Sequence, residues 1–176
     1  MKNLNIDKYL TYRYSFSKLK KSITNEFYFE AILIEYAIIE DRIYSFFRRL
    51  GFLNESGNLP EGKRKLLKRT FHKQTLRWTD ISVKIKLIET LISLESFHVT
   101  NHEDKTYLLE FSLRIKPFHD EIQQIILQLS PWLKIRNRYV HALMEYKTNT
   151  IEDELKAFVT QGETIIRLLD SLVKKI

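Results

Sequence analysis

Residues 25–50 read NEFYFEAILIEYAIIEDRIYSFFRRL, and this stretch decides the fold. Apolar side chains recur along it at helical spacing, and Thr24 is placed to cap its start. Arg48 and Arg49 fall in the last turn, and Gly51 follows, as is common where a helix ends. The pattern therefore predicts one long helix. Its middle is apolar on nearly every side, which is typical of a helix packed within its own bundle or partly against a second copy of the chain.

The next apolar stretch, residues 80–95, also predicts a helix. The residues that form its apolar stripe are Ile81, Ile85, Ile88 and Ile92. Apolar and polar residues also alternate over 81–87, which is the pattern of a half-buried strand. We favour the helix because the helical spacing continues to the end of the stretch and no partner strand is evident.

Breaks in the pattern divide the rest of the chain. The sequence NESGNLPEG at 54–62 predicts a loop. After the polar stretch 101–105 apolar spacing resumes until Pro117, where proline should kink or restart the helix. A further helical segment reaches Leu129.

Two capping patterns then predict the last helices. Ser130 and Pro131 match the N-cap and first-turn proline of a new helix. Thr150 with Asp153 resembles a capping box that opens a final helix running to the C-terminus. The sequence thus predicts an all-α fold, a single domain over residues 1–176 built as a bundle of about five helices.

Composition narrows the class of protein. The chain has 176 residues, 44% of them hydrophobic, and no cysteine, which excludes a disulfide framework, a cysteine nucleophile and thiolate-bound metal. The first fifteen residues scatter charge where a signal peptide needs an apolar run. The most apolar window, 31–39, is interrupted by Glu35 and is too short to span a membrane. We expect a soluble, cytoplasmic protein that does not contact membrane.

Positive charge is concentrated in one segment. The chain carries 29 Lys and Arg against 22 Asp and Glu, a net charge of +7. Within 61–77 one acid, Glu61, faces seven basic residues, namely Lys63, Arg64, Lys65, Lys68, Arg69, Lys73 and Arg77. This distribution is typical of a phosphate-contacting surface, so we expect these residues to bind RNA, although a solvated helix face gives the same pattern.

The segment from Pro131, PWLKIRNRYVHALMEY, contains the residues best suited to chemistry. Projected at about 100° per residue, His141 lies opposite an apolar stripe that includes Trp132 and Tyr139, and Asn137 precedes it by one turn. An imidazole exchanges protons near neutral pH, and guanidinium groups hold phosphate. Arg136 projects about 140° away from His141, toward apolar neighbours.

The sequence from Arg136 to His141, RNRYVH, resembles the R-N-x-x-x-H form of the R-x(4–6)-H motif of the HEPN superfamily. The segment FEAILIEYAIIEDRIYSFF is similar to the first long helix of that fold, and the likeness covers residues 20–175. The resemblance implies a HEPN-like helical domain and a metal-independent endoribonuclease that cleaves RNA as a homodimer. Arg136, Asn137 and His141 would be the catalytic residues. It also implies a toxin or phage-defence setting, with an antitoxin protein as a candidate partner.

Other candidate groups are weaker. Glu40 and Asp41 are candidates to orient Arg136 as supporting carboxylates, and Arg138 is a supporting cation, although an exposed acid pair is the commoner explanation on a long helix. Arg114 and His119 have the motif spacing, but Pro117 lies between them and Ile115 replaces the usual polar residue, so we set this pair aside. No cluster predicts a metal site, because His98 and His102 bracket a poor helix-forming stretch, and no cofactor is expected.

Two alternatives remain open. The same bundle is compatible with a catalytically silent module that binds nucleic acid or nucleotide through the basic segment, or with a protein-interaction module. A helical transcription regulator fits less well, because no short turn precedes a basic recognition helix.

Overall fold

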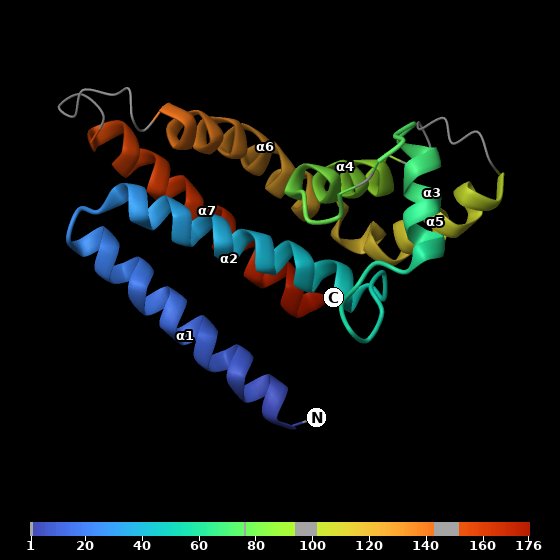
Figure 1. The fold of residues 1–176 in the computed structure, drawn as a ribbon, viewed down its shortest axis with the longest axis horizontal. Helices are drawn as coiled ribbons and strands as arrows, with labels where there is room; N and C mark the ends of the chain where they lie inside the picture. The colour runs from blue at the N-terminus through green and yellow to red at the C-terminus, as the bar shows by residue number, and fades with distance from the viewer. Residues whose placement is uncertain (1, 76, 94–101, 143–151) are drawn as a thin grey trace. The chain divides into compact units, whose positions relative to one another are not determined.

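The structure is a computed structural model that describes residues 2–75, 77–93, 102–142 and 152–176 (Figure 1). The predicted all-α class is confirmed, because these residues form helices and contain no strand. The predicted number of about five helices is too low. The described helices are α1 (Lys2–Thr24), α2 (Tyr28–Arg49), α3 (Glu61–Thr70), α4 (Ile81–Ile92), α5 (His102–Ile115), the 3-10 helix η1 (Lys116–Phe118), α6 (His119–Ala142) and α7 (Glu152–Lys175).

The start of the long helix differs from the prediction. Thr24 is the last residue of α1, and α2 begins only at Tyr28. Glu26 adopts a φ of 60°, and the Phe27 N–H donates to the Ser22 carbonyl at 2.8 Å. This is a Schellman-type helix end, and it uses the polar residues that otherwise suggested a helix start.

The end of α2 matches the prediction. Gly51 has a φ of +73°, which L side chains rarely adopt, and the Phe52 N–H donates to the Phe47 carbonyl at 2.9 Å. The rings of Phe47 and Phe52 lie 5.7 Å apart, the apolar contact that accompanies this helix end. The predicted loop at 54–62 is confirmed up to Pro60, and α3 takes its last two residues.

Two later predictions have opposite outcomes. The helix expected from residue 80 is α4, with Asp80 at its N-cap, so the helical interpretation of 81–87 is confirmed over the strand. The new helix expected at Pro131 is wrong, because α6 runs through this proline without a break. Pro131 is exposed, so water can solvate the carbonyl that lacks its helical N–H donor. The capping pair at Thr150 lies outside the described residues, but the final helix it should open is present as α7.

Residue contacts group the chain into two compact units. The first comprises Met1–Asp41 and Gln128–Arg167, and the second comprises Arg42–Leu127 and Leu168–Ile176. Helices α2, α6 and α7 contribute residues to both units. The single domain expected from chain length stays a prediction.

The first unit is built around α2 and α7. Gly162 on α7 gives room to Glu35 on α2, since a Cβ at Gly162 would overlap the Glu35 carboxylate. On α6, Trp132 stacks on Phe158 of α7 with ring centroids 5.0 Å apart. On α1, Tyr12 donates a hydrogen bond to Asp41. The unit therefore places α6 against α7 and α1 against α2.

The second unit has an aromatic core at the end of α2. Phe47, Phe52, Trp78 and Phe111 lie in contact, with ring centroids between 4.9 and 6.0 Å apart. The Arg114 side chain on α5 donates to the Leu50 carbonyl at 2.9 Å and so satisfies a carbonyl that follows the last turn of α2. None of the described helices is long and apolar enough to cross a membrane.

Candidate functional site

The candidate site lies on the C-terminal half of α6, within the first unit. Its outer face carries the exposed residues Lys134, Asn137, Arg138 and His141. Trp132 and Tyr139 are buried on the opposite side, as the helical projection predicts. The predicted polar, cationic strip around His141 is thus present. His141 has no hydrogen-bond or ion-pair partner among the described residues.

The position of α6 is fixed by aromatic packing on α7. The Trp132 indole Nε1 donates to the Phe158 carbonyl at 3.3 Å, and Tyr139 meets the Phe158 ring edge-on at 5.5 Å. The Tyr139 hydroxyl donates to Glu154 at 3.2 Å. Burial raises the pKa of Tyr139, and the bond to Glu154 adds to the rise. Tyr139 therefore stays neutral at physiological pH and acts as part of the support for the helix.

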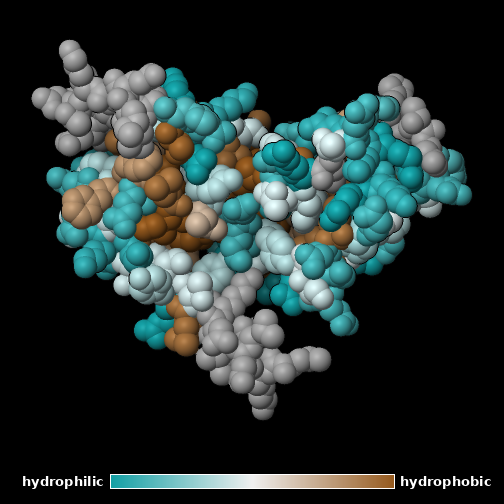
Figure 2. All heavy atoms as spheres, in the orientation of Figure 1, coloured by the Kyte–Doolittle hydropathy of each residue, from teal (hydrophilic) through white to brown (hydrophobic). Residues whose placement is uncertain are grey.

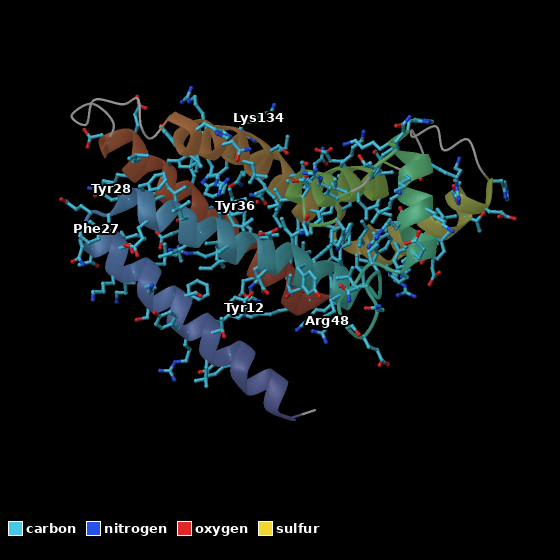
Figure 3. The ribbon with its side chains drawn as sticks, viewed as in Figure 1. Tyr12, Phe27, Tyr28, Tyr36, Arg48 and Lys134 are labelled. Atoms are coloured by element: carbon cyan, nitrogen blue, oxygen red, sulfur yellow. The ribbon has the colours of Figure 1, made fainter. Side chains whose placement is uncertain are left out.

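Arg136 turns inward, toward α2. Its guanidinium carbon lies 3.9 Å from the centre of the Tyr36 ring, and Nη1 donates to Asn137 Oδ1 at 3.0 Å. The Nε atom is buried and has no hydrogen-bond partner among the described residues. Figure 3 labels Tyr36 on α2 and Lys134 on α6, the two helices that bracket this side chain. The guanidinium is thus held by an aromatic face and a neutral amide, and no carboxylate in the part of the chain that the structure describes pairs with it.

The structure brings Arg136 and Asn137 together but separates Arg136 from His141. The two lie about 140° apart around α6, with Arg136 half-buried against α2 and His141 exposed. Within one chain these two groups do not converge on one point. A site that uses both needs either a rearranged arginine or a second copy of the chain.

No hydrogen bond or ion pair among the described residues joins Arg136 to the expected orienting acids. Asp41 accepts the hydrogen bond from Tyr12, and Glu40 is half-buried on α2. Tyr36, which sequence reasoning did not single out, holds the guanidinium instead. No signal in the sequence indicated this role, because a tyrosine within an apolar helical stretch is normally predicted to pack in the hydrophobic core. A supporting role for Glu40 and Asp41 stays a prediction.

A buried acid lies next to Tyr36 in the chain. Glu35 is fully buried, and neither carboxylate oxygen has a hydrogen-bond partner among the described residues. Burial raises the pKa of Glu35 to about 9, the charge of Glu163 adds to the rise, and the Glu163 backbone offsets only part of it. Glu35 is therefore neutral at physiological pH. The sequence showed it only as an interruption of an apolar window.

The basic segment lies in the second unit, mostly on α3. Leu66, Leu67 and Thr70 are buried, and the opposite face exposes Arg64 and Lys65. Half-buried Lys68 and, beyond the helix, the exposed Lys73 and Arg77 complete the cations available to an anion. Arg64 lies 3.9 Å from Glu61, an exposed pair of little strength.

Two of the seven basic residues make tertiary contacts, and their predicted role in binding RNA stays a prediction. Lys63 Nζ donates to the carbonyls of Gly51 and Phe52 at 2.9 and 3.0 Å, and burial lowers the pKa of its ammonium group. Arg69 binds Asp104 through two bonds of 2.8 and 2.5 Å. The partners of Lys63 follow α2 and the partner of Arg69 is on α5, both outside the basic segment, so a charge count within that segment could not separate these two residues from the other cations.

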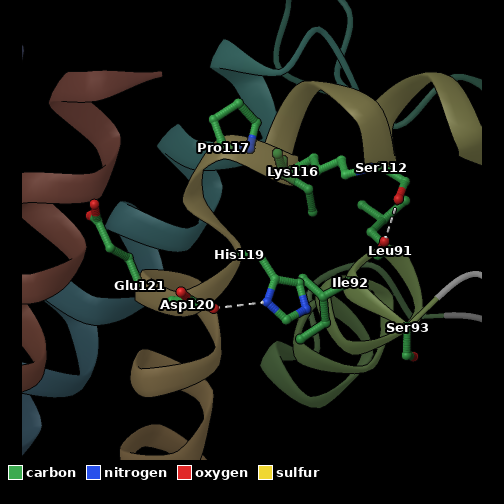
Figure 4. Close-up of a pocket in the computed structure, with 10 residues that line it drawn as sticks. Leu91, Ile92, Ser93, Ser112, Lys116, Pro117, His119, Asp120 and Glu121 are labelled. Atoms are coloured by element: carbon green, nitrogen blue, oxygen red, sulfur yellow. Dashed lines mark hydrogen bonds and ion pairs between the residues drawn. The ribbon is translucent and has the colours of Figure 1, made fainter.

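The second unit also contains a pocket of about 870 Å³ between the end of α4 and the start of α6 (Figure 4). Its polar lining comprises Ser93, Ser112, Lys116, His119, Asp120 and Glu121. His119 Nδ1 lies 3.3 Å from Asp120, whereas Arg114 bonds Leu50 and Glu110. The rejected Arg114 and His119 pair thus has separate partners. The described residues contain no group of three or more side chains that could hold a metal ion.

Comparison with known proteins adds no relative. No protein-family model, no curated protein and no solved structure matches the chain. The candidate function therefore depends on the residues of α6 and their surroundings.

Proposed function

We propose that the protein is a metal-independent endoribonuclease of HEPN type that acts as a homodimer. The observation that carries the proposal is Arg136, a guanidinium held on Tyr36 with no carboxylate partner among the described residues, one turn and a half before the exposed His141. A cation and a free imidazole on one rigid helix are the groups that phosphodiester cleavage requires.

The RNA strand supplies its own nucleophile. His141 of one protomer accepts the proton of the 2′-hydroxyl as the 2′-oxygen bonds to phosphorus. The bond from phosphorus to the 5′-oxygen breaks, and His141 of the partner subunit donates a proton to the leaving oxygen. Arg136 stabilises the charge on the pentavalent phosphate. The products are a 2′,3′-cyclic phosphate and a free 5′-hydroxyl.

The outer face of α2 supports pairing with a second copy. Leu33 is 39% exposed and Ala37, one turn later, is also exposed, so this helix leaves apolar surface uncovered beside Tyr36. Figure 2 shows hydrophobic surface over this part of the molecule. A two-fold contact here would bring two copies of Tyr36, Arg136 and the α6 strip near one axis, which a single chain needs to complete its site.

Cleavage of total tRNA in the presence of a chelator tests the proposal. We expect the wild-type protein to cut RNA without metal, and His141→Ala to remove cleavage without changing the circular dichroism spectrum, because the side chain is exposed. Asn137→Ala is expected to weaken cleavage only partly, since it supports Arg136. Cleavage that survives His141→Ala, or that requires magnesium, would contradict the assignment.

A second candidate is a catalytically silent nucleic-acid-binding module. The exposed cations of α3 and the residues after it favour this reading, since Arg64, Lys65, Lys73 and Arg77 are open to an anion. A salt-sensitive shift of tRNA without cleavage would support it. An antitoxin protein stays part of the nuclease proposal, as the partner that would cover the α6 strip.

A further inference from the structure

Helix α1 belongs to the first unit and buries one narrow side. Leu19 and Ser22 are buried, and Tyr12 is half-buried against α2. A shallow pocket between α1 and α7 is lined by Phe16 and Leu19 from one helix and Ile166 from the other. The remaining surface of α1 faces outward over more than half of its circumference.

The outward surface combines cations with aromatic rings. Tyr9 is 60% exposed and Tyr14 is 62% exposed, with Leu10 between them. The cations on this surface are Arg13, Lys18, Lys20 and Lys21, all exposed. No acidic residue occurs from Lys8 to Asn25. This second cationic segment was not identified from the sequence, because acidic residues elsewhere in the chain offset its charge when the net charge outside 61–77 is counted.

Cations and rings are paired along the helix. The Arg13 guanidinium lies 5.9 Å from the centre of the Tyr9 ring, and Lys18 Nζ lies 5.4 Å from that of Tyr14. Each pair is one helical turn long, and the second pair follows the first by five residues, an axial step of about 7.5 Å. The result is two exposed rings, each with a cation beside it, about 140° apart around the outward surface of the helix.

We propose that this surface of α1 is a docking site for single-stranded RNA, with the cations on phosphates and Tyr9 and Tyr14 as stacking platforms for bases. The ligand class rests on the proposed function, which makes RNA the substrate. A site of stacking rings within a positive groove or face is how proteins hold single strands without sequence preference.

The arrangement disfavours two other occupants. A membrane-surface helix separates its apolar and cationic faces, whereas here Arg13 and Lys20 project between Tyr9 and Leu10. The same surface of a second copy would set its four exposed cations against four others, with no acid within the segment from Lys8 to Asn25. Neither objection applies to a polyanion.

Fluorescence anisotropy with a single-stranded 2′-O-methyl oligouridine tests the proposal. This probe lacks the nucleophilic 2′-hydroxyl, so binding is measured on the full-length wild-type protein whether or not it is a nuclease. We expect Tyr9→Ala with Tyr14→Ala to weaken binding about thirtyfold or more. Arg13→Gln with Lys18→Gln is expected to lower the slope of log Kd against log salt by about 1.4.

Matched variants make the result specific. Lys105→Gln with Lys156→Gln removes two exposed lysines from α5 and α7 and so changes the net charge equally. Binding unchanged in the α1 variants, or lost equally in these controls, would overturn the proposal, as would α1-dependent binding to phosphatidylserine vesicles with none to the oligonucleotide. Loss of binding confined to α1 supports it even if tRNA is never cleaved, whereas cleavage with α1-independent binding overturns this site and leaves the nuclease.

Discussion

At the scale of the residue, two neighbouring side chains of α2 have unusual surroundings: Tyr36 contacts Arg136 of α6, and Glu35 lies against Gly162 of α7. Tyr36 holds the Arg136 guanidinium, which pairs with no acid among the described residues, and Glu35 is an acid that burial keeps protonated. Both arrangements place an unusual polar group in an apolar setting, and both tie α2 to a neighbouring helix.

Glu35 makes stability depend on pH. Its folded pKa of about 9 lies above the unfolded value of 4.5, so the folded state binds an extra proton between these values. The free energy of unfolding therefore falls by up to about 1.4 kcal/mol per pH unit across this window and levels off above it. We expect urea denaturation of Glu35→Gln to lack this decline, so that the variant gains on the wild type from about pH 5 to about pH 9.

The control is Glu30→Gln, an exposed acid on the same helix. It is expected to track the wild type at every pH. Parallel curves for Glu35→Gln and the wild type would show that Glu35 is ionised in the folded protein and would contradict the buried, neutral acid.

Arg136 should not be replaceable by lysine. Lysine keeps the charge, but it cannot lie flat on Tyr36 and reach Asn137 at the same time. We expect Arg136→Lys to lower the rate of RNA cleavage about tenfold or more with little change in melting temperature, as measured by a gel assay and a thermal scan. Lys134→Arg, on the exposed face, serves as the control. Full activity in Arg136→Lys would contradict the stacked guanidinium as a working part of the site.

At the scale of the element, the contact between α2 and α7 depends on a missing side chain. Gly162 lies in the middle of α7, where glycine is otherwise unfavourable, and a Cβ there would overlap the Glu35 carboxylate. Gly62 lies in α3 with nothing within 4 Å of its Cβ position. Replacing each glycine by alanine therefore compares a crowded position, Gly162, with an open one, Gly62.

We expect Gly162→Ala to lower the free energy of unfolding by about 1–3 kcal/mol through overpacking. Gly62→Ala should raise it by about 0.5–1 kcal/mol, because alanine favours the helix. Urea denaturation measures both. A stabilised Gly162→Ala would show that the helices are not in close contact at Glu35.

The sequence predicted the helix ends that are determined by the backbone preferences of single residues. Gly51 ends α2 and Pro117 ends α5 because each acts on its own backbone. Pro131 misled, because proline at an exposed position can be carried within a helix that is held by packing on both sides of it. Helix α1 was missed because its buried side is narrow and its outward surface mixes charge and aromatic rings.

The candidate site was predicted in part for the same reason. The exposed strip with His141 follows from helical periodicity alone, whereas the inward direction of Arg136 acquires meaning only from Tyr36, a hundred residues earlier in the chain. Lys63 and Arg69 joined the predicted RNA-binding set because their partners, Gly51 and Asp104, are tertiary contacts.

At the scale of the whole molecule, the proposal requires two chains. Of the two exposed histidines of α6, only His141 lies in the candidate site, because His119 is at the other end of the helix and pairs with Asp120. Arg136 lies on another side of the helix. Cleavage that uses one base and one acid therefore needs His141 from both protomers, and subunits must exchange freely for a mixed dimer to form.

Adding an excess of the His141→Ala chain to the wild-type protein measures this sharing directly. Mixed dimers would contain one imidazole instead of two, so the account predicts that RNA cleavage per wild-type chain falls steeply as the inactive chain is added. If the rate per wild-type chain stays constant at every ratio, although native mass spectrometry shows mixed dimers, then each chain acts alone and the shared pocket does not exist.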